Sequence, residues 1–250
     1  MPETASKIRI QGAQAPITVI GCGARWIVVE KPCGISIHND PGSDLCSLVL
    51  AALHSGRLTG LSREISALHA AHRLDKETSG IVLLAGDSET LAFFGRQFTE
   101  KAVSKRYLAM VHGCIEMAAA NEEWTDWTWP LTRAAAGRND PMGRGDRMPC
   151  ATRVRRVSKS PHYSLIECEP LTGRKHQIRR HAKLAGHPVV GDRRYGSARS
   201  LAYLRQHHNF QRLGLHAHAL TIRLPGEDKI TTFESNGLPE QLRQLFESDR

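Results

Sequence analysis

The stretch that decides the fold of this chain reads HRLDKETSG at residues 72–80 and continues as IVLLA at residues 81–85. A polar turn with one central carboxylate, Asp75, thus leads through a glycine into an apolar run. A short apolar run bounded by turn residues predicts a buried strand. Asp75 is therefore expected in a loop at the end of a rigid strand, a common place for binding and catalytic groups. Taken alone, it also fits a structural acid that caps a turn or pairs with an arginine.

Length and composition limit the class of protein. The chain has 250 residues, of which 40% are hydrophobic, so it can bury a core and is not a disordered chain. No apolar run approaches the roughly 18 residues of a membrane span, and the N-terminus lacks the apolar segment of a signal peptide. The six cysteines include no CxxC pair, which is typical of reduced thiols. We expect a cytoplasmic protein that does not act on a membrane.

Positive charge is concentrated in one part of the chain. The net charge is +9, yet residues 151–220 hold fourteen Lys or Arg against three acidic residues. A basic region in an otherwise nearly neutral chain favours a polyanionic partner. A solvated basic face is the alternative. An anionic membrane surface is disfavoured because no basic amphipathic helix with an aromatic apolar face is present.

The pattern of apolar and turn residues predicts mixed strands and helices. Asp87 is expected to cap a helix, with Glu89 in its first turn. Such a mixture indicates an α+β fold, with a largely antiparallel mixed sheet and flanking helices. Strands are predicted at 26–30, 35–38, 81–85, 103–111, 154–157, 163–169 and 213–224, and helices at 47–54, 88–97, 176–185 and 239–246.

The domain organisation is expected to be simple. We predict an N-terminal tail at 1–17 and one catalytic domain at 18–250, interrupted by a surface insertion near 118–148. The insertion carries three of the four tryptophans. We expect it to be ordered in part by these tryptophans and flexible in part.

A second dense motif, TGRKHQIRRH, carries two sets of cationic side chains. On a helix, Lys175, Arg179 and Lys183 would share one face at i, i+4 spacing, and His176 and Arg180 another. Such a stripe at a glycine-led helix start could hold phosphate through side chains and backbone N–H groups. An ordinary cationic surface helix is an equally good interpretation of this motif alone.

Three residues could combine into a reactive site. Arg179 could pair with Asp75, which would keep the carboxylate ionised and oriented as a nucleophile or base. Tyr107 is expected on the polar face of its strand beside Lys105, where a phenol could stack on a base and exchange a proton. The alternative for Tyr107 is a core tyrosine with a satisfied hydroxyl.

Metal and nucleotide-cofactor chemistry find no support in the motifs. His216 and His218 share a strand face, and His176 and His181 a helix, but no acid or cysteine completes a recognisable ligand set. The sequence has no Walker GxxxxGK[ST] loop, no GxGxxG and no GxSxG. We therefore predict no metal site and no nucleotide cofactor.

Five motifs in this order and spacing resemble the RluA family of pseudouridine synthases, from about residue 26 to residue 224. Each motif alone is moderately specific, whereas all five in order are highly specific. They are HRLD with its TSG at 72–80, KRYLA at 105–109, TGRKHQIRRH at 172–181, GHPVVGD at 186–192 and LHAHAL at 215–220.

The resemblance implies a fold, a reaction and a set of residue roles. Family members share the pseudouridine synthase fold, with a catalytic cleft across the sheet. They detach the uracil of a chosen uridine in folded RNA, rotate it and rejoin it through C5, without cofactor or metal. Asp75 matches the essential aspartate, which attacks C1′ or removes the 2′ proton, and Arg179 the basic residue that pairs with it. Tyr107 matches the tyrosine that stacks on the uracil and helps to remove the C5 proton. Ile178 lines the uracil pocket, and Arg73 fills the gap left by the flipped uridine.

The expected partner is therefore RNA, either tRNA or ribosomal RNA, bound by a monomer. Extruding a base costs a few kcal/mol, and cations that grip phosphates would hold the RNA meanwhile. The further residues expected to bind the substrate are His72, Lys105, Arg174, Lys175, His176, Arg180 and Lys183.

Two features depart from the commoner family pattern. Many relatives carry a small N-terminal RNA-binding domain called S4, which we do not expect here because the family motifs begin by about residue 26. The run GRKHQIRRH resembles the tRNA-modifying TruC branch more than the ribosomal branches. Two other functions remain open on the residues: a catalytically silent RNA-binding or chaperone protein on the same scaffold, and a nucleosidase-type hydrolase, which would release free uracil.

Overall fold

The computed structural model describes residues 7–8, 16–58, 60–116 and 124–249. The chain divides into two compact units. Unit 1 comprises Met1–Ser104 and Ala217–Gly237, and unit 2 comprises Lys105–His216 and Leu238–Arg250. Most of the predicted tail and residues 118–123 of the predicted insertion lie outside the described residues. The single catalytic domain at 18–250 stays a prediction.

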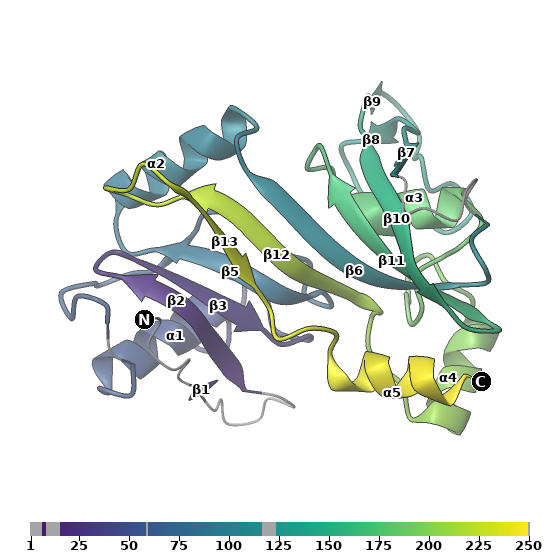
Figure 1. Cartoon of the computed structure of the whole chain (residues 1–250), viewed down its shortest axis with the longest axis horizontal. Helices are drawn as coiled ribbons and strands as arrows, with labels where there is room; N and C mark the ends of the chain where they lie inside the picture. Colours follow the sequence, from purple (N-terminus) through teal and green to yellow (C-terminus); the bar gives the residue numbers. More distant parts are fainter. Residues whose placement is uncertain (1–6, 9–15, 59, 117–123, 250) are drawn as a thin grey trace. The chain divides into compact units, whose positions relative to one another are not determined.

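Unit 1 is built on a sheet that carries the decisive stretch (Figure 1). The apolar run becomes β5, and all seven residues of this strand are buried. β5 pairs antiparallel with β3, so Trp26 lies opposite Ala85 and Lys31 opposite Gly80. The strands follow the order β1 (Lys7–Ile8), β2 (Ile17–Gly23), β3 (Trp26–Lys31), β5 (Ser79–Ala85) and β12 (Leu215–Arg223), with β4 (His69–Ala70) beside β5 and β13 (Ile230–Glu234) beside β12.

The described residues of unit 1 also form two helices, and each has an aspartate at its N-cap. The Asp44 side chain accepts a hydrogen bond from the Ser47 N–H at the start of α1 (Leu45–His54). Asp87 does the same for the Thr90 N–H at the start of α2 (Ser88–Thr99), as the sequence predicts. α2 packs on the sheet through an apolar cluster that includes Val28, Ile81, Leu83, Phe94, Leu220 and Ile222. Burial of this cluster fixes the position of β5, and hence of the turn that precedes it.

The strand predicted at 35–38 is wrong. The carbonyl groups of Ser36 and Ile37 accept the N–H groups of Leu45 and Cys46 at the start of α1. The Ile35 carbonyl accepts a hydrogen bond from the side chain of Lys31. These acceptors serve a helix start and a buried lysine, so they are not available to a strand ladder.

Unit 2 contains an antiparallel sheet and a separate two-stranded ribbon. The sheet order is β6 (Ser104–His112), β11 (Tyr163–Pro170), β10 (Thr152–Lys159) and β7 (Thr125–Trp127), and the ribbon pairs β8 (Leu131–Thr132) with β9 (Arg147–Met148). The predicted insertion is thus ordered over residues 124–148. Its Trp127 is buried, in agreement with an ordering role for the tryptophans.

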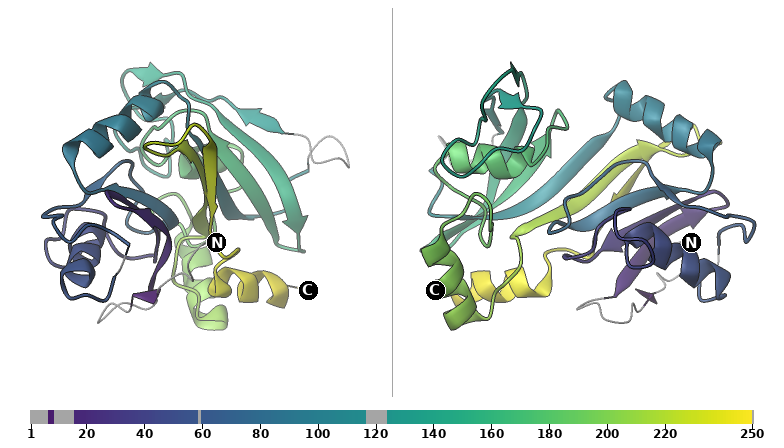
Figure 2. Two further views of the ribbon diagram at one scale, coloured as in Figure 1. Left: turned by 60° about the vertical axis from the view of Figure 1, so that its left-hand side comes forward. Right: turned by 180° about the vertical axis from the view of Figure 1, so that it is seen from behind.

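Within its described part, unit 2 also contains three helices. α3 (Gln177–Leu184) contacts β10 and β11. α4 (Ala198–His208) and α5 (Glu240–Ser248) lie side by side (Figure 2). Leu204 of α4 and Leu242 and Leu245 of α5 belong to the same buried apolar cluster. The motif helix begins one residue later than predicted and ends one residue earlier.

The predicted α+β class is confirmed, with antiparallel pairing wherever a register is defined. The other predicted strands and helices form within a few residues of their expected bounds. The sequence did not predict α4, nor the strands β1, β2, β4, β7, β8, β9 and β13.

Candidate active site

Hydrogen bonds from a buried lysine, Lys31, hold the Asp75 turn in position. Lys31 ends β3 and is 0% exposed. Its Nζ donates to the carbonyl groups of Pro32 at 3.0 Å, Ile35 at 2.8 Å and Lys76 at 3.2 Å. The Lys76 carbonyl also accepts the N–H of Gly34. Because one ammonium group gathers these acceptors, the position of the turn beside Asp75 is tied to the end of β3.

Three further contacts hold this turn and the start of β5 in position. On its outer side Lys76 forms an ion pair with Asp40 at 3.0 Å. Within the turn, the carbonyl of Asp75 accepts the N–H of Thr78. At the start of β5, Gly80 has φ +115, and a Cβ there would lie 2.2 Å from the carbonyl oxygen of Ala217. Only glycine lets β12 come this close.

His72 is part of the strand framework. Its Nε2 accepts the N–H of Leu83 in β5 at 3.2 Å, which assigns the proton of the neutral ring to Nδ1. The ring also contacts the ring of Phe98, with centroids 5.5 Å apart. Arg73, the next residue, is exposed. The motif therefore combines a residue built into the strand with a solvent-exposed guanidinium.

Tyr107 lies in unit 2, on a sheet face next to α3. In the register of the sheet, Tyr107 is opposite Cys168 and Cys168 is opposite Val154, so the three share one face. Thr152 lies on the same face, two residues before Val154. The side chain of Gln177, the first residue of α3, donates to the Thr152 hydroxyl at 2.9 Å. Tyr107 itself is 9% exposed.

Arg179 is held by a partner that the sequence interpretation did not assign to it. Its Nε and Nη2 donate to the two carboxylate oxygens of Asp192 at 2.7 and 2.9 Å. Asp192 also accepts the backbone N–H groups of Arg194 and Tyr195. Both charged side chains are buried. A bidentate pair of this kind fixes the plane of the guanidinium.

Tyr195 connects this pair to His176. The Arg179 guanidinium lies 5.5 Å from the centre of the Tyr195 ring, within the range of a cation–π contact. Burial raises the pKa of Tyr195, which keeps its phenol protonated. The hydroxyl lies 3.0 Å from Nδ1 of His176, which has the left-handed φ of 56. Such a backbone in a non-glycine residue is sparsely populated and is often found at functional sites.

The prediction that Arg180 binds RNA phosphate is contradicted. Its side chain is 0% exposed, and its guanidinium donates to the carbonyls of Thr132, Pro141 and Met142 and to further oxygens. A donor set used in this way cannot serve a phosphate. The predicted helix face is also incomplete, because Lys175 precedes α3 and is not part of the helix.

The other predicted contacts occupy different environments. Ile178 is buried in the first turn of α3 and Lys183 is half-buried in its last, whereas Lys175 is exposed. Burial lowers the pKa of Lys105. The Nε of Arg174 is buried, and no described residue accepts its hydrogen. A buried donor without an acceptor is rare in native proteins and calls for an explanation.

The described residues contain no helix with the length and apolarity of a membrane span. Over the same part of the chain, no group of three or more His, Cys, Asp or Glu side chains could hold a metal ion.

Sequence reasoning missed Lys31, Asp192 and Tyr195 as positioning residues. For Asp192 a signal existed, since an aspartate after a glycine often accepts backbone N–H groups two and three residues later. Lys31 gave no such signal, because a lysine before a proline at the end of a strand is usually solvated.

Asp75 belongs to unit 1, and Tyr107 and Arg179 belong to unit 2. Within unit 2, α3 brings Arg179 and Ile178 to the sheet that carries Tyr107, since it contacts β10 and β11. The meeting of Asp75 with Arg179 stays a prediction.

Comparison with known proteins gives consistent matches. A family model described as RNA pseudouridylate synthase matches residues 25–184. The ribosomal large subunit pseudouridine synthase C of Vibrio vulnificus is 33% identical over 258 residues, covering 100% of this chain and 75% of that protein. The ribosomal large subunit pseudouridine synthase D of Zymomonas mobilis is 31% identical, covering 92% of this chain and 72% of that protein. Among solved structures, the human RNA pseudouridylate synthase domain containing 1 shares the fold, with a TM-score of 0.68 at 22% identity over 96% of this chain and 97% of that one.

Proposed function

Because this chain belongs to the RluA family of RNA pseudouridine synthases, we propose that it isomerises a uridine of large-subunit ribosomal RNA, with Asp75 as its essential carboxylate. The observation that carries the proposal is the family match over residues 25–184, a range that includes Asp75, Tyr107 and Arg179. Ribosomal RNA is preferred over tRNA as the target because relatives that are 33% and 31% identical are named for the large ribosomal subunit.

The reaction rearranges bonds within one nucleotide. The N1–C1′ bond breaks, the C5–C1′ bond forms, C5 gives up one proton and N1 takes up one proton from solvent. No electrons are gained or lost. Asp75 either attacks C1′ or removes the 2′ proton, and in both cases it acts as the ionised carboxylate.

Arg179 is proposed to hold Asp75 in this ionised form. A guanidinium has five N–H donors in one plane, and Asp192 binds Nε and Nη2. Because Asp192 fixes that plane, a second carboxylate would meet a guanidinium that needs no reorientation. Asp192 and Tyr195 are therefore positioning residues that act through Arg179.

Tyr107 is proposed to stack on the uracil and help to remove its C5 proton, with Ile178 as the apolar wall of the pocket. Both side chains are buried in unit 2, where a stacked base would be shielded from water. Arg73, which is exposed, is proposed to occupy the space that the flipped uridine leaves in the RNA stack.

Contacts to the RNA backbone are proposed for the segment at 174–175 and for Lys105 and Lys183. Arg174 directly precedes Lys175 in this segment and is half-buried. Lys175 is exposed and precedes His176, whose strained backbone orients the start of α3. Lys105 and Lys183 complete the proposed set, and His72 is proposed to position the Asp75 turn.

Tritium release tests the activity. Ribosomal RNA labelled with tritium at C5 of uridine should lose label to water with this enzyme, and Asp75→Asn should abolish the loss while RNA binding persists. Glu64→Gln is the matched control, because it removes a carboxylate from the same unit at a side chain that is 83% exposed. Release that persists in Asp75→Asn would contradict the mechanism.

The products separate this proposal from the other two functions. Free uracil would indicate the nucleosidase-type hydrolase, and binding without release from any RNA would indicate the silent RNA-binding protein. Mapping pseudouridine in total RNA, with and without the protein, identifies the target. A difference confined to tRNA would overturn the ribosomal assignment and leave the reaction intact. A cytoplasmic monomer stays our prediction, which cell fractionation and light scattering test.

A further inference from the structure

The segment 131–148 of unit 2 is held in shape through its main chain. Buried Arg180 donates to the carbonyl groups of Pro141 and Met142, both at 2.6 Å, and of Thr132 at 3.0 Å. Arg194 donates to the carbonyl of Ala136 at 2.7 Å. We call residues 131–148 the arginine-held loop. Two guanidinium groups from outside the loop thus bind its carbonyl groups, in addition to the β8–β9 pairing at its ends and the hydrogen bond from Arg147 to the Gly143 carbonyl.

Contacts inside the loop stiffen its turn. The N–H of Gly143 donates to the Asp140 carboxylate at 3.0 Å. Gly143 has φ +84, and a Cβ there would collide with the hydroxyl of Thr132. The Thr132 hydroxyl in turn accepts from Arg180 and donates to Ala134. Residues 132–143 therefore form a preorganised turn, in which the carboxylate of Asp140 is already committed to the backbone.

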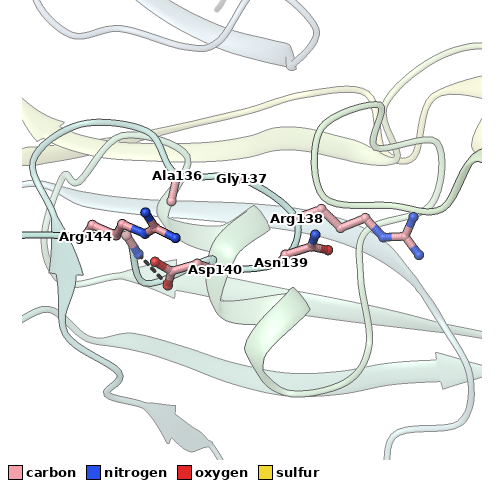
Figure 3. Close-up of a pocket in the computed structure, with 7 residues that line it drawn as sticks. Ala136, Gly137, Arg138, Asn139, Asp140 and Arg144 are labelled. Carbon is pink, nitrogen blue, oxygen red and sulfur yellow. Dashed lines mark hydrogen bonds between the residues drawn. The ribbon is translucent and has the colours of Figure 1, made fainter.

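The arginines of the loop itself remain at the surface. Arg133, Arg138 and Arg144 are exposed. Arg138 and Arg144 lie at opposite ends of an open cavity of about 400 Å³ (Figure 3). The cavity is lined by Ala136, Gly137, Arg138, Asn139, Asp140, Gly143 and Arg144.

The loop also adjoins a segment already proposed to bind RNA. Arg180 donates to the carbonyl of Lys175 at 3.3 Å as well as to the loop carbonyls. One buried side chain thus joins the loop to the residues around Arg174 and Lys175 within unit 2. The exposed guanidinium groups of the loop extend this cationic surface, and a polyanion that binds one part would meet the other.

We propose that Arg138 and Arg144 bind two phosphates of the substrate RNA outside the flipped nucleotide. The inference rests on the proposed function for the identity of the RNA. Guanidinium groups bind phosphate through paired N–H donors, and a loop fixed in advance loses little conformational freedom when it binds. The arginine-held loop thereby selects among uridines by the path of the RNA backbone beside the target.

Salt-dependent binding tests the proposal. In an Asp75→Asn background, binding of ribosomal RNA is measured from low to high salt for the parent and for Arg138→Ala/Arg144→Ala. Each neutralised phosphate contributes about 0.7–0.9 to the slope of log K against log salt, so the double variant should lose about 1.5. The pair Arg57→Ala/Arg63→Ala is the control, because it removes the same charge from exposed positions of unit 1.

The expected result is a reduced slope for the loop variant alone, with the slope restored in Arg138→Lys/Arg144→Lys. In the Asp75 protein, tritium release at RNA concentrations below saturation should fall for the loop variant and stay unchanged for Arg57→Ala/Arg63→Ala. An unchanged slope, or an equal loss in the control, would overturn the proposal. If the slopes are as predicted but the protein with Asp75 intact releases no tritium, the proposed function fails and the loop contact stands.

Discussion

The carboxylate of Asp192 accepts hydrogen bonds from Nε and Nη2 of Arg179. The side chain of Asp192 is 0% exposed and that of Arg179 is 3% exposed. Two backbone N–H groups also donate to Oδ1 of Asp192. The pair is therefore buried, bidentate and supported by the main chain, which is the geometry in which a buried ion pair holds a fixed orientation.

Asp192→Ala should reduce the free energy of unfolding by about 3–5 kcal/mol, because it leaves a buried charge without its partner. Asp192→Asn keeps the shape and should cost less stability. It should lower kcat for tritium release more than it raises KM, since Arg179 loses its fixed plane. Denaturant unfolding and single-turnover release measure both effects. Glu240→Gln, at an exposed ion pair with Arg243, should change neither, and an equal effect in this control would contradict the positioning role.

Lys31→Met should destabilise unit 1 by about 1–3 kcal/mol, the typical cost of leaving buried hydrogen-bonding groups unpaired. The Asp75 turn should then become mobile, and turnover per folded molecule should fall. Lys76→Met is the matched change on the same turn, because it removes an exposed ammonium group paired with Asp40, and it should leave stability nearly unchanged. Hydrogen exchange of residues 73–78 reports the mobility directly. If residues 73–78 of Lys31→Met exchange hydrogen at the wild-type rate, Lys31 does not hold the turn in position.

Arg180→Lys should loosen the arginine-held loop without removing a charge, because an ammonium group cannot reach the many carbonyls that the guanidinium binds. Trypsin should cleave at Arg133 and Arg138 faster than in the parent protein. The salt slope of RNA binding should be unchanged, since Arg180 is buried. Lys183→Ala is the contrast, and its slope should fall by about 0.7–0.9. A lower slope for Arg180→Lys that persists in the Arg138→Ala/Arg144→Ala background would indicate a direct phosphate contact of Arg180.

Acid should destabilise unit 2 through His181. Burial lowers the pKa of this histidine below its ordinary value of about 6.5. The unfolded chain therefore binds a proton that the folded chain excludes, and stability falls as the pH drops below about 6.5, by at most about 1.4 kcal/mol per pH unit. Thermal unfolding between pH 7.5 and 5.5 measures the slope. His181→Gln should flatten it, and a slope unaltered in that variant would assign the effect to other groups.

The hydrogen bonds of His181 explain this sign. Its Nε2 lies 2.9 Å from the carbonyl of Trp129, so Nε2 carries the proton, and Nδ1 accepts from the Thr152 hydroxyl. That hydroxyl already accepts from Gln177. A proton on Nδ1 of His181 would point at the hydrogen of the Thr152 hydroxyl. The neutral imidazole is therefore the form that this environment favours.

Local sequence patterns were sufficient for the elements that carry the motifs. The apolar run at 81–85 became a fully buried strand, and Asp87 capped its helix, because both depend on neighbours in the chain. The failure at 35–38 has a long-range cause, since the carbonyl groups of that segment are used by α1 and Lys31. A pattern of side chains does not reveal where backbone groups find their partners.

The same distinction applies to the site. The motifs indicated Asp75, Tyr107 and Arg179 as residues that act together, and the family match includes all three. Arg179 and Arg180 are adjacent and chemically identical, yet one binds Asp192 and the other binds loop carbonyls. Their roles are decided by which acceptors the fold brings within reach, and this could not be inferred from their shared residue type.

The way in which residues 131–148 are held has a consequence for divergence and for engineering. Since Arg180 and Arg194 bind carbonyl oxygens, which every amino acid supplies, the outline of the segment does not depend on the side chains at its tip. Positions such as 138, 139 and 144 could be exchanged without a new scaffold. A library confined to those positions would be a direct route to enzymes that modify a different uridine.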